Sequence, residues 1–284
     1  MAEIKAITQR ELQDISGKTG FAILPLIKDY YITLTLYLLK DVEGLYFKGG
    51  TALQKIFLKQ SRLSEDIDYT LTEEMDIVKK KIEETVMQSG FFEKVSKDKH
   101  ISDFLRLIVH YTDPFGNQGE VFIDLNKKAK LVLAPEVYGV PHFYTDNIPE
   151  FSVRTLHIKE LVAEKIRAAV ARNKPRDHFD VYQIISNNLP VDLNLVKEKC
   201  KSAGHEFDII RMFHNANKLK NRWDTDVAPL LREEVKFLEV MKTLASYFKY
   251  AEEKKMKRQN KPEKLLREES GQLSLWREDR DTEP

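Results

Sequence analysis

Cysteine is nearly absent from this sequence of 284 residues, which contains only Cys200. A single cysteine cannot form an intramolecular disulfide or a cysteine-rich zinc site, so a small disulfide scaffold is excluded. Neither sign of charge is in excess, because 46 lysines and arginines stand against 45 aspartates and glutamates. A nucleic-acid partner would therefore have to be held by a local basic patch rather than by bulk charge.

Long hydrophobic runs are also lacking. The most apolar stretch, residues 21–39, is interrupted by Pro25, Lys28 and Asp29, and the N-terminus is charged where a signal peptide would be apolar. We therefore expect a cytoplasmic protein without a membrane partner. Three catalytic signatures are missing as well: the seven histidines show no HExxH spacing, and neither GxSxG nor a Walker A loop occurs.

The periodicity of apolar residues divides the chain into a mixed N-terminal part and a helical C-terminal part. Helical spacing is expected over 8–39, 73–89, 156–173, 176–186, 193–203, 206–221 and 227–249. Alternation predicts strands within 61–72, 104–113 and 119–126, the last two joined by the turn sequence PFGNQG. Prolines 135, 141 and 149 break regular structure before a boundary near Val153. We expect one domain over 1–153, a helical domain over 154–250 and a charged, mobile tail over 251–284.

Two aspartates lie two residues apart in the first expected strand. Asp66 and Asp68 alternate with Ile67 and Tyr69, so both carboxylates face the same side of the strand. Carboxylates at this spacing are close enough to share a hard cation such as Mg²⁺, which substrate phosphates complete. Alternatively, the pair is the solvated face of an edge strand.

A glycine turn precedes this strand. Gly49, Gly50 and Thr51 open an expected helix, and backbone amides at such a position can cradle phosphates. A plain turn remains the alternative. A third acid, Asp124, faces the same way as Glu120 and Phe122 on a later strand, which makes it a candidate to join the aspartate pair at a metal.

Lys165 lies inside the apolar stripe of the helix expected from residue 156, where lysine is rarely found. Its charge must be compensated, either by a bound triphosphate or by an acidic neighbour such as Asp180, unless the side chain extends to water. Arg172 and Arg176 extend the positive region, and Arg62 joins it if the two parts meet. These arginines could hold a triphosphate or an RNA backbone, or could simply be solvated.

Two segments together resemble a known family. KGGTALQKIFLKQSRLSEDIDYTL is similar to the first motif of the AbiEii (DUF1814) nucleotidyltransferase toxins of abortive-infection and type IV toxin–antitoxin systems. KELVAEKIRAAVARNKPRDHFDVYQI resembles the later motif of that family. The resemblance implies the fold of the DNA polymerase β superfamily, an α/β (α+β) mixed sheet flanked by helices, followed by a mainly helical C-terminal domain.

The same resemblance implies an enzyme that transfers a nucleoside monophosphate from an NTP to an RNA acceptor, with tRNA as the expected acceptor. It places Mg²⁺, or Mn²⁺ instead, on Asp66 and Asp68, and Ser64 beside the nucleotide phosphates. Lys165 becomes the catalytic or phosphate-binding lysine and Asp180 the acidic residue of the later motif, with Asp177 as the rival alignment. The role of Asp124 as a third metal ligand is the least defined of these.

The resemblance also implies a toxin with a cognate antitoxin as partner. Two alternatives stay open at the level of the sequence. The chain could be a nucleotide-binding regulatory module without turnover, or a nucleotidyltransferase that modifies a protein or a small molecule, because a fold does not fix an acceptor.

Overall fold

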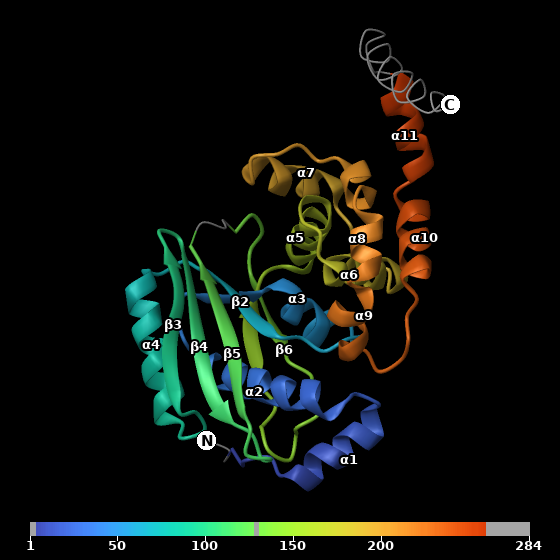
Figure 1. The fold of residues 1–284 in the computed structure, drawn as a ribbon. Helices are drawn as coiled ribbons and strands as arrows, with labels where there is room; N and C mark the ends of the chain where they lie inside the picture. The colour runs from blue at the N-terminus through green and yellow to red at the C-terminus, as the bar shows by residue number, and fades with distance from the viewer. Residues whose placement is uncertain (1–3, 128–130, 260–284) are drawn as a thin grey trace, which may run out of the picture.

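A seven-stranded mixed sheet forms the N-terminal part of the computed structural model, which describes residues 4–127 and 131–259 (Figure 1). Its spatial order is β3-β4-β5-β2-β1-β7-β6. The strands are β1 (Leu45–Lys48), β2 (Asp66–Leu71), β3 (Lys94–Ile101), β4 (Phe104–Thr112), β5 (Gln118–Asn126), β6 (Glu136–Gly139) and β7 (Ser152–Thr155). The expected α/β class, a mixed sheet flanked by helices, is confirmed.

The middle of the sheet is built around β2. This strand pairs antiparallel with β1 and parallel with β5, and β5 forms an antiparallel hairpin with β4 across the predicted turn. Alternation along β4 and β5 places Leu107, Val109 and Ile123 in the core, while the opposite side chains are partly exposed. The two acidic strands are therefore neighbours in a rigid, half-buried sheet.

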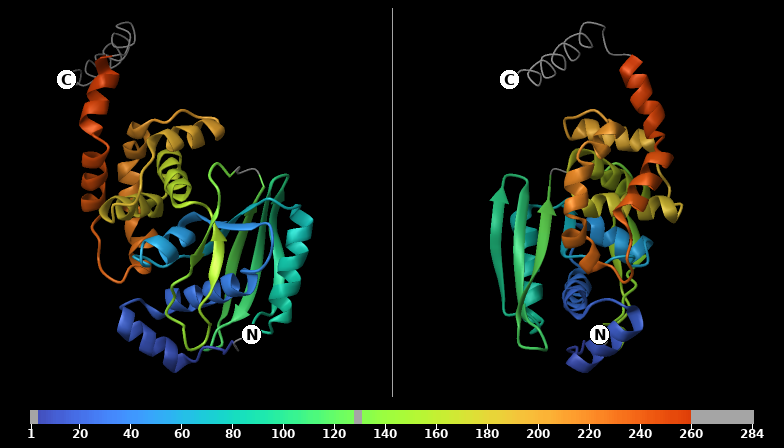
Figure 2. Two further views of the ribbon diagram at one scale, coloured as in Figure 1. Left: turned by 180° about the vertical axis from the view of Figure 1, so that it is seen from behind. Right: turned by 45° about the vertical axis from the view of Figure 1, so that its right-hand side comes forward.

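Helices cover the buried face and form the C-terminal part of the molecule (Figure 2). They are α1 (Gln9–Thr19), α2 (Ile23–Leu39), α3 (Gly49–Ala52), α4 (Met75–Gln88), α5 (Ile158–Ala171), α6 (Pro175–Ser186), α7 (Leu193–Ser202), α8 (Ala216–Asn221), α9 (Trp223–Asp226), α10 (Phe237–Tyr247) and α11 (Tyr250–Gln259). A π-helix, η1 (Leu53–Phe57), continues α3, and the 3₁₀ helices are η2 (Ile209–Phe213) and η3 (Ala228–Leu230). Helix α5 packs on α6 and α7, whereas α2 packs on α4 and β5.

The single helical segment expected over 8–39 is instead two helices. Thr8 and Glu11 form a capping box that starts α1, and Gly20 ends it in the left-handed conformation with φ of 79°. Among the described residues, no single helix is long and apolar enough to cross a membrane, although α1 and α2 pass such a test as a pair bent by 109°.

Three elements were not expected from the sequence. Strand β3 is an exposed edge strand and carries charge on both sides. Because it lacks alternating apolar residues, the sequence pattern did not predict it. Strand β6 lies in the proline-containing segment 130–151 that we expected to be irregular, and it forms the other edge of the sheet. The expected boundary at 153 falls inside β7, which pairs with β1, so the sheet continues to Thr155.

The later helical segments are shorter than expected. The region expected as one helix over 206–221 contains η2 and α8, and the region 227–249 contains η3 and α10. Residues 250–259, in the expected mobile tail, form helix α11. The rest of that tail, 260–284, lies outside the described residues.

Candidate active site

Strand β2 presents the two predicted metal ligands. Asp66 and Asp68 are both partly exposed on one face, whereas Ile67 between them is fully buried on the other. The parallel register sets Asp68 directly beside Asp124 of β5, and the antiparallel register sets it beside Lys48 of β1. Three carboxylates and a lysine therefore share one face in the middle of the sheet.

Asp68 is the carboxylate most disturbed by this arrangement. Burial, together with the negative charges of Asp66 and Asp124, raises the pKa of Asp68 to about 7 against the opposing effect of Lys48 and Lys165. Repulsion between these clustered acids would be relieved by a bound cation.

The glycine turn lies directly against these acids. Gly49 has φ of 78°, and a Cβ atom on it would be 2.1 Å from Asp68 Oδ2. A Cβ atom on Gly50 would be 2.9 Å from the Arg62 guanidinium and 3.3 Å from Lys165 Nζ. The pair is more than a plain turn, because side chains of the acidic and the basic groups approach the backbone here where only glycine leaves room.

Lys165 is buried, as the apolar stripe of α5 predicts, with 6% of its surface exposed. Its ammonium lies 2.9 Å from Asp177 Oδ1 and 2.9 Å from Asp180 Oδ2. Burial lowers the pKa of Lys165, but the two carboxylates outweigh that effect and raise it. The acidic-neighbour alternative is therefore what the structure shows, and both rival aspartates contact the lysine.

Asp180 is fully buried and saturated with donors. Arg62 donates two hydrogen bonds to it, at 2.7 and 2.8 Å, and Gln54 Nε2 donates a third at 2.8 Å. These contacts fix Arg62 inside the protein, although we expected it to be available to a nucleotide. Asp180 and Arg62 thus position Lys165 and the segment before β2.

Asp177 links the lysine to the surface. Burial raises the pKa of Asp177, but Lys165 and the hydrogen bonds from Arg172 outweigh it and lower the pKa. Arg172 keeps half of its side chain exposed, and burial lowers its pKa, but Asp177 outweighs that effect and raises it, with further contributions from Asp68 and Asp66. Arg176, on the next helix, forms an ion pair with Glu65, the neighbour of Asp66.

Asp124 has a different partner from the one the sequence suggested. Arg106 of β4 holds both of its carboxylate oxygens at 2.7 Å. Within the described residues, no three His, Cys, Asp or Glu side chains form a group able to hold a metal ion. Asp66 and Asp68 are thus the pair most open to a cation, and Asp124 reaches one only if Arg106 moves.

The hydroxyl groups of Thr51 and Ser64, both near the glycine turn and β2 in the sequence, have different surroundings. Thr51 Oγ1 donates to the backbone carbonyl of Asp66 and so braces β2 rather than facing a ligand. Ser64 Oγ is buried and is left without a hydrogen-bond partner among the described residues. Buried hydroxyls rarely remain unpaired, so Ser64 is a candidate contact for a bound group.

Three residues of the site escaped the sequence analysis. Gln54 is a polar residue among buried side chains and donates to Asp180. Lys48 precedes the glycine turn and forms an ion pair with Glu164 of α5 at 3.4 Å. Arg106 could have been found, since the hairpin turn fixes the register that sets it opposite Asp124.

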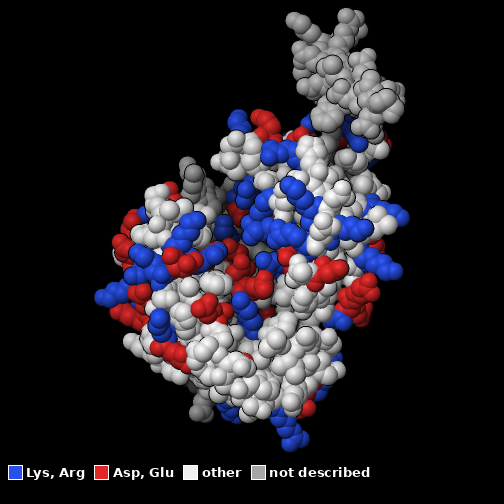
Figure 3. All heavy atoms as spheres, viewed as in Figure 1, with Lys and Arg blue, Asp and Glu red and all other residues white. Residues whose placement is uncertain are grey.

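A bound divalent cation fits this donor set. Asp66 and Asp68 are hard oxygen ligands, Asp68 resists ionisation without a counter-charge, and the glycine at 49 leaves its carboxylate uncovered. Figure 3 shows acidic side chains in a hollow at the centre of this face, with lysine and arginine side chains gathered beside it over the helical part.

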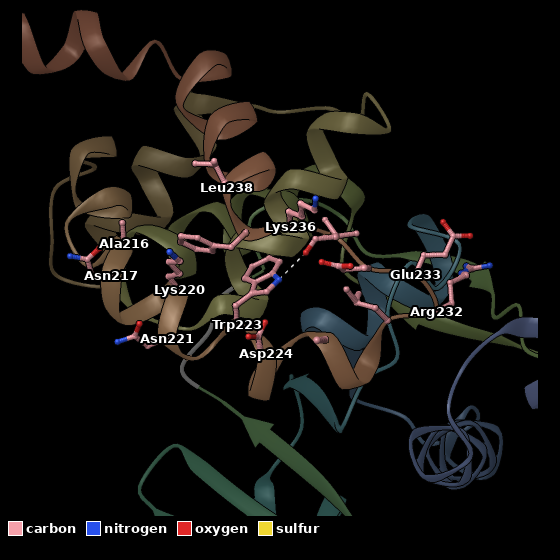
Figure 4. Close-up of a pocket in the computed structure, with 15 residues that line it drawn as sticks. Ala216, Asn217, Lys220, Asn221, Trp223, Asp224, Arg232, Glu233, Lys236 and Leu238 are labelled. Carbon is pink, nitrogen blue, oxygen red and sulfur yellow. Dashed lines mark hydrogen bonds between the residues drawn. The ribbon is translucent and has the colours of Figure 1, made fainter.

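A separate groove lies in the C-terminal helical part, apart from this site. It has a volume of about 840 Å³ between α8, α9 and the start of α10 (Figure 4). Trp223 lies along it and donates from Nε1 to the Val235 carbonyl at 2.9 Å. The groove shares no residue with the aspartate pair or the Lys165 cluster.

Comparison with protein families decides the assignment. The profile described as "Nucleotidyl transferase AbiEii toxin, Type IV TA system" matches residues 36–261, which include every residue of the site. The chain belongs to the AbiEii family. It is a nucleotidyltransferase of the toxin type, as the two motifs predicted, and that family suggests an antitoxin partner and a nucleotide substrate.

Solved structures share the fold of this AbiEii chain. JHP933 from Helicobacter pylori is 16% identical with a TM-score of 0.57, covering 90% of this chain and 99% of that one. MenT4, described as a nucleotidyltransferase toxin from Mycobacterium tuberculosis H37Rv, is 20% identical with a TM-score of 0.53, covering 78% and 73%. No curated protein matches the sequence.

Proposed function

We propose that this AbiEii nucleotidyltransferase transfers a nucleoside monophosphate from an NTP to the 3′ end of tRNA and releases pyrophosphate, with Mg²⁺ held by Asp66 and Asp68. Mn²⁺ could replace Mg²⁺ on the same ligands. Transfer to tRNA would block translation in the cytoplasm and give the chain its toxicity, which a cognate antitoxin would oppose.

One observation carries this proposal: an acidic and a basic group meet at the glycine turn. The carboxylate of Asp68 approaches Gly49, and the ammonium of Lys165 approaches Gly50. A nucleoside triphosphate with its metal needs both, namely oxygen ligands for the cation and positive charge for the phosphates. A regulatory module that binds a nucleotide would need the same two groups, so transfer of the nucleotide is what separates an enzyme from such a module.

On the donor side, Arg172 is the cation best placed to bind phosphate, because half of its side chain is exposed beside the aspartates. Lys165, which Asp177 and Asp180 hold in place, adds positive charge from the buried side of the site. Ser64 can donate its unpaired hydroxyl to a phosphate oxygen. Asp66 and Asp68 would hold the cation, which would supply positive charge to the phosphate oxygens.

On the acceptor side, Asp124 of β5 is paired in register with Asp68 of β2. As a carboxylate it can orient an attacking 3′-hydroxyl and accept its proton once Arg106 has moved aside. The two substrates would then be separated, with the phosphate ligands toward α5 and α6 and the acceptor residue toward β4.

The test is a transfer assay with each α-labelled NTP, Mg²⁺ and total RNA. We expect label in tRNA-sized RNA with the unaltered protein and none with Asp68→Ala. The matched control is Asp14→Ala, which removes an exposed aspartate on α1 and should leave transfer unchanged. Thermal unfolding of both variants checks that the fold persists.

Other outcomes are informative. Label in protein or in a small molecule would replace tRNA as acceptor while keeping the enzyme. Bound NTP with no transfer to any acceptor, and equal toxicity of Asp68→Ala in cells, would overturn the proposal in favour of a binding module.

A further inference from the structure

The face of the sheet that carries the aspartate pair continues across β5 and β4. In register, Asp66 lies beside Phe122, and Phe122 lies beside Ile108. Residues paired in register share a face, so an aromatic ring stands next to the carboxylates on the side away from Lys165. Neighbouring strands lie about 5 Å apart, which keeps this ring within one strand of the site.

Phe122 is placed unlike the core aromatics. Its ring is only partly buried and borders a groove of about 470 Å³ between β4, β5 and α2. Two cations flank the ring: the Arg106 guanidinium carbon lies 5.3 Å from its centroid, and Lys28 Nζ lies 5.4 Å from it. A partly exposed aromatic ring with basic side chains over it can bind single-stranded nucleic acid when a base takes the place of a cation on the ring and the cations turn to the phosphates.

We propose that Phe122 is the platform on which a terminal base of a single-stranded RNA acceptor stacks, with Arg106 and Lys28 turning to its phosphates. The inference rests on the proposed function only in taking RNA as the acceptor. Phe122 is not the site of the NTP base, because the phosphate-binding groups lie beyond β2 in the opposite direction.

Stacking would also free Asp124. Arg106 now contacts both the ring of Phe122 and the carboxylate of Asp124. A base that displaces the guanidinium from the ring, and a phosphate that attracts it, would loosen its hold on Asp124. Acceptor binding and exposure of the acceptor-side carboxylate are therefore one event.

Kinetics with Phe122→Leu test the platform, because leucine keeps an apolar side chain but lacks a π-face. We expect the KM for the RNA acceptor to rise about 5- to 100-fold, as loss of one base–aromatic stack predicts, with the KM for NTP within about twofold. Phe122→Tyr should restore the acceptor KM. Phe115→Leu, at an exposed phenylalanine of the β4–β5 turn, is the matched control and should change neither constant.

A second measurement needs no chemistry. In an Asp68→Asn background, Phe122→Trp should report stacking as quenched fluorescence on addition of a single-stranded oligoribonucleotide, relative to the same chain without that tryptophan. A blunt RNA duplex should quench less. Unchanged acceptor KM in Phe122→Leu, or no quenching at RNA concentrations that saturate binding, would overturn the platform even if transfer itself is intact. Quenching without transfer would instead retain the platform and reject the proposed reaction.

Discussion

Lys165 Nζ lies midway between two buried carboxylates, 2.9 Å from Asp177 and 2.9 Å from Asp180. Each carboxylate has a further cation, Arg172 on Asp177 and Arg62 on Asp180. The lysine therefore joins two ion pairs into one chain that runs from the half-exposed Arg172 to the buried segment before β2. Its role combines stability with positive charge at the site.

Replacing Lys165 should lower the stability of the fold and remove positive charge from the site. Lys165→Met leaves two buried carboxylates with one cation each, so we expect the free energy of unfolding to fall by about 3 kcal/mol. Adding Asp177→Asn removes one of the two buried carboxylates that have lost the ammonium as a hydrogen-bond donor, and should recover part of that loss. Transfer should remain absent in both variants. Urea unfolding measures the stability, and an unchanged midpoint in Lys165→Met would show that the chain of ion pairs carries little of it.

The glycine turn can be tested with a matched pair. Gly49 and Gly90 have φ of 78° and 74°, but a Cβ atom would collide with Asp68 only at Gly49, and no atom lies within 4 Å at Gly90. Both Gly49→Ala and Gly90→Ala should lose about 1–2 kcal/mol through the left-handed backbone. Only Gly49→Ala should also abolish transfer. Equal activity of the two variants would contradict the close packing of Asp68 on the turn.

The pKa of Asp68 predicts a stability difference that depends on pH. Burial raises this pKa to about 7, above the value of about 3.9 in an unfolded chain. The folded state thus binds the proton more tightly, so ionised Asp68 destabilises the fold fully above pH 7 and not at all below pH 4. In metal-free buffer, Asp68→Asn should stabilise the protein more at pH 8 than at pH 5.

Adding Mg²⁺ supplies the control for that measurement. The cation compensates the ionised carboxylate, so it should raise the melting temperature of the unaltered protein at pH 8 and reduce the advantage of Asp68→Asn. An equal effect of Mg²⁺ on both proteins would mean that Asp68 is not a ligand.

Arg106 and Asp124 make opposite predictions for metal dependence. Arg106→Met frees the carboxylate of Asp124, so the Mg²⁺ concentration that gives half-maximal transfer should fall. Asp124→Asn should raise that concentration and slow transfer. A Mg²⁺ titration of the initial rate measures both, and full activity of Asp124→Asn would remove this residue from the site.

The sequence alone predicts the parts of this protein whose pattern is local. Alternation around Ile67 and along β4 and β5 identifies the strands, and the turn between β4 and β5 fixes their register. The spacing of Asp66 and Asp68 is likewise local. A lysine in an apolar stripe correctly indicates burial with compensation of its charge.

Other features depend on contacts between distant residues. Which aspartate meets Lys165 cannot be read from spacing, because helices α5 and α6 pack so that both do. Gln54 and Asp180 are 126 positions apart. The sequence did not predict strand β3, because an edge strand needs no apolar side. The helices expected after Ser202 were too long, because the buried apolar residues there belong to several short helices near Trp223.

Two ion pairs hold the sheet to the helical part on either side of the site. Lys48 of β1 meets Glu164 of α5 at 3.4 Å, and Arg62 before β2 meets Asp180 of α6 at 2.7 Å. Because the two parts are held together at these two points, we expect the cleft not to open and close about a hinge. Nucleotide capture should therefore follow a single exponential in rapid mixing, with a rate that rises in proportion to NTP concentration and reaches no plateau.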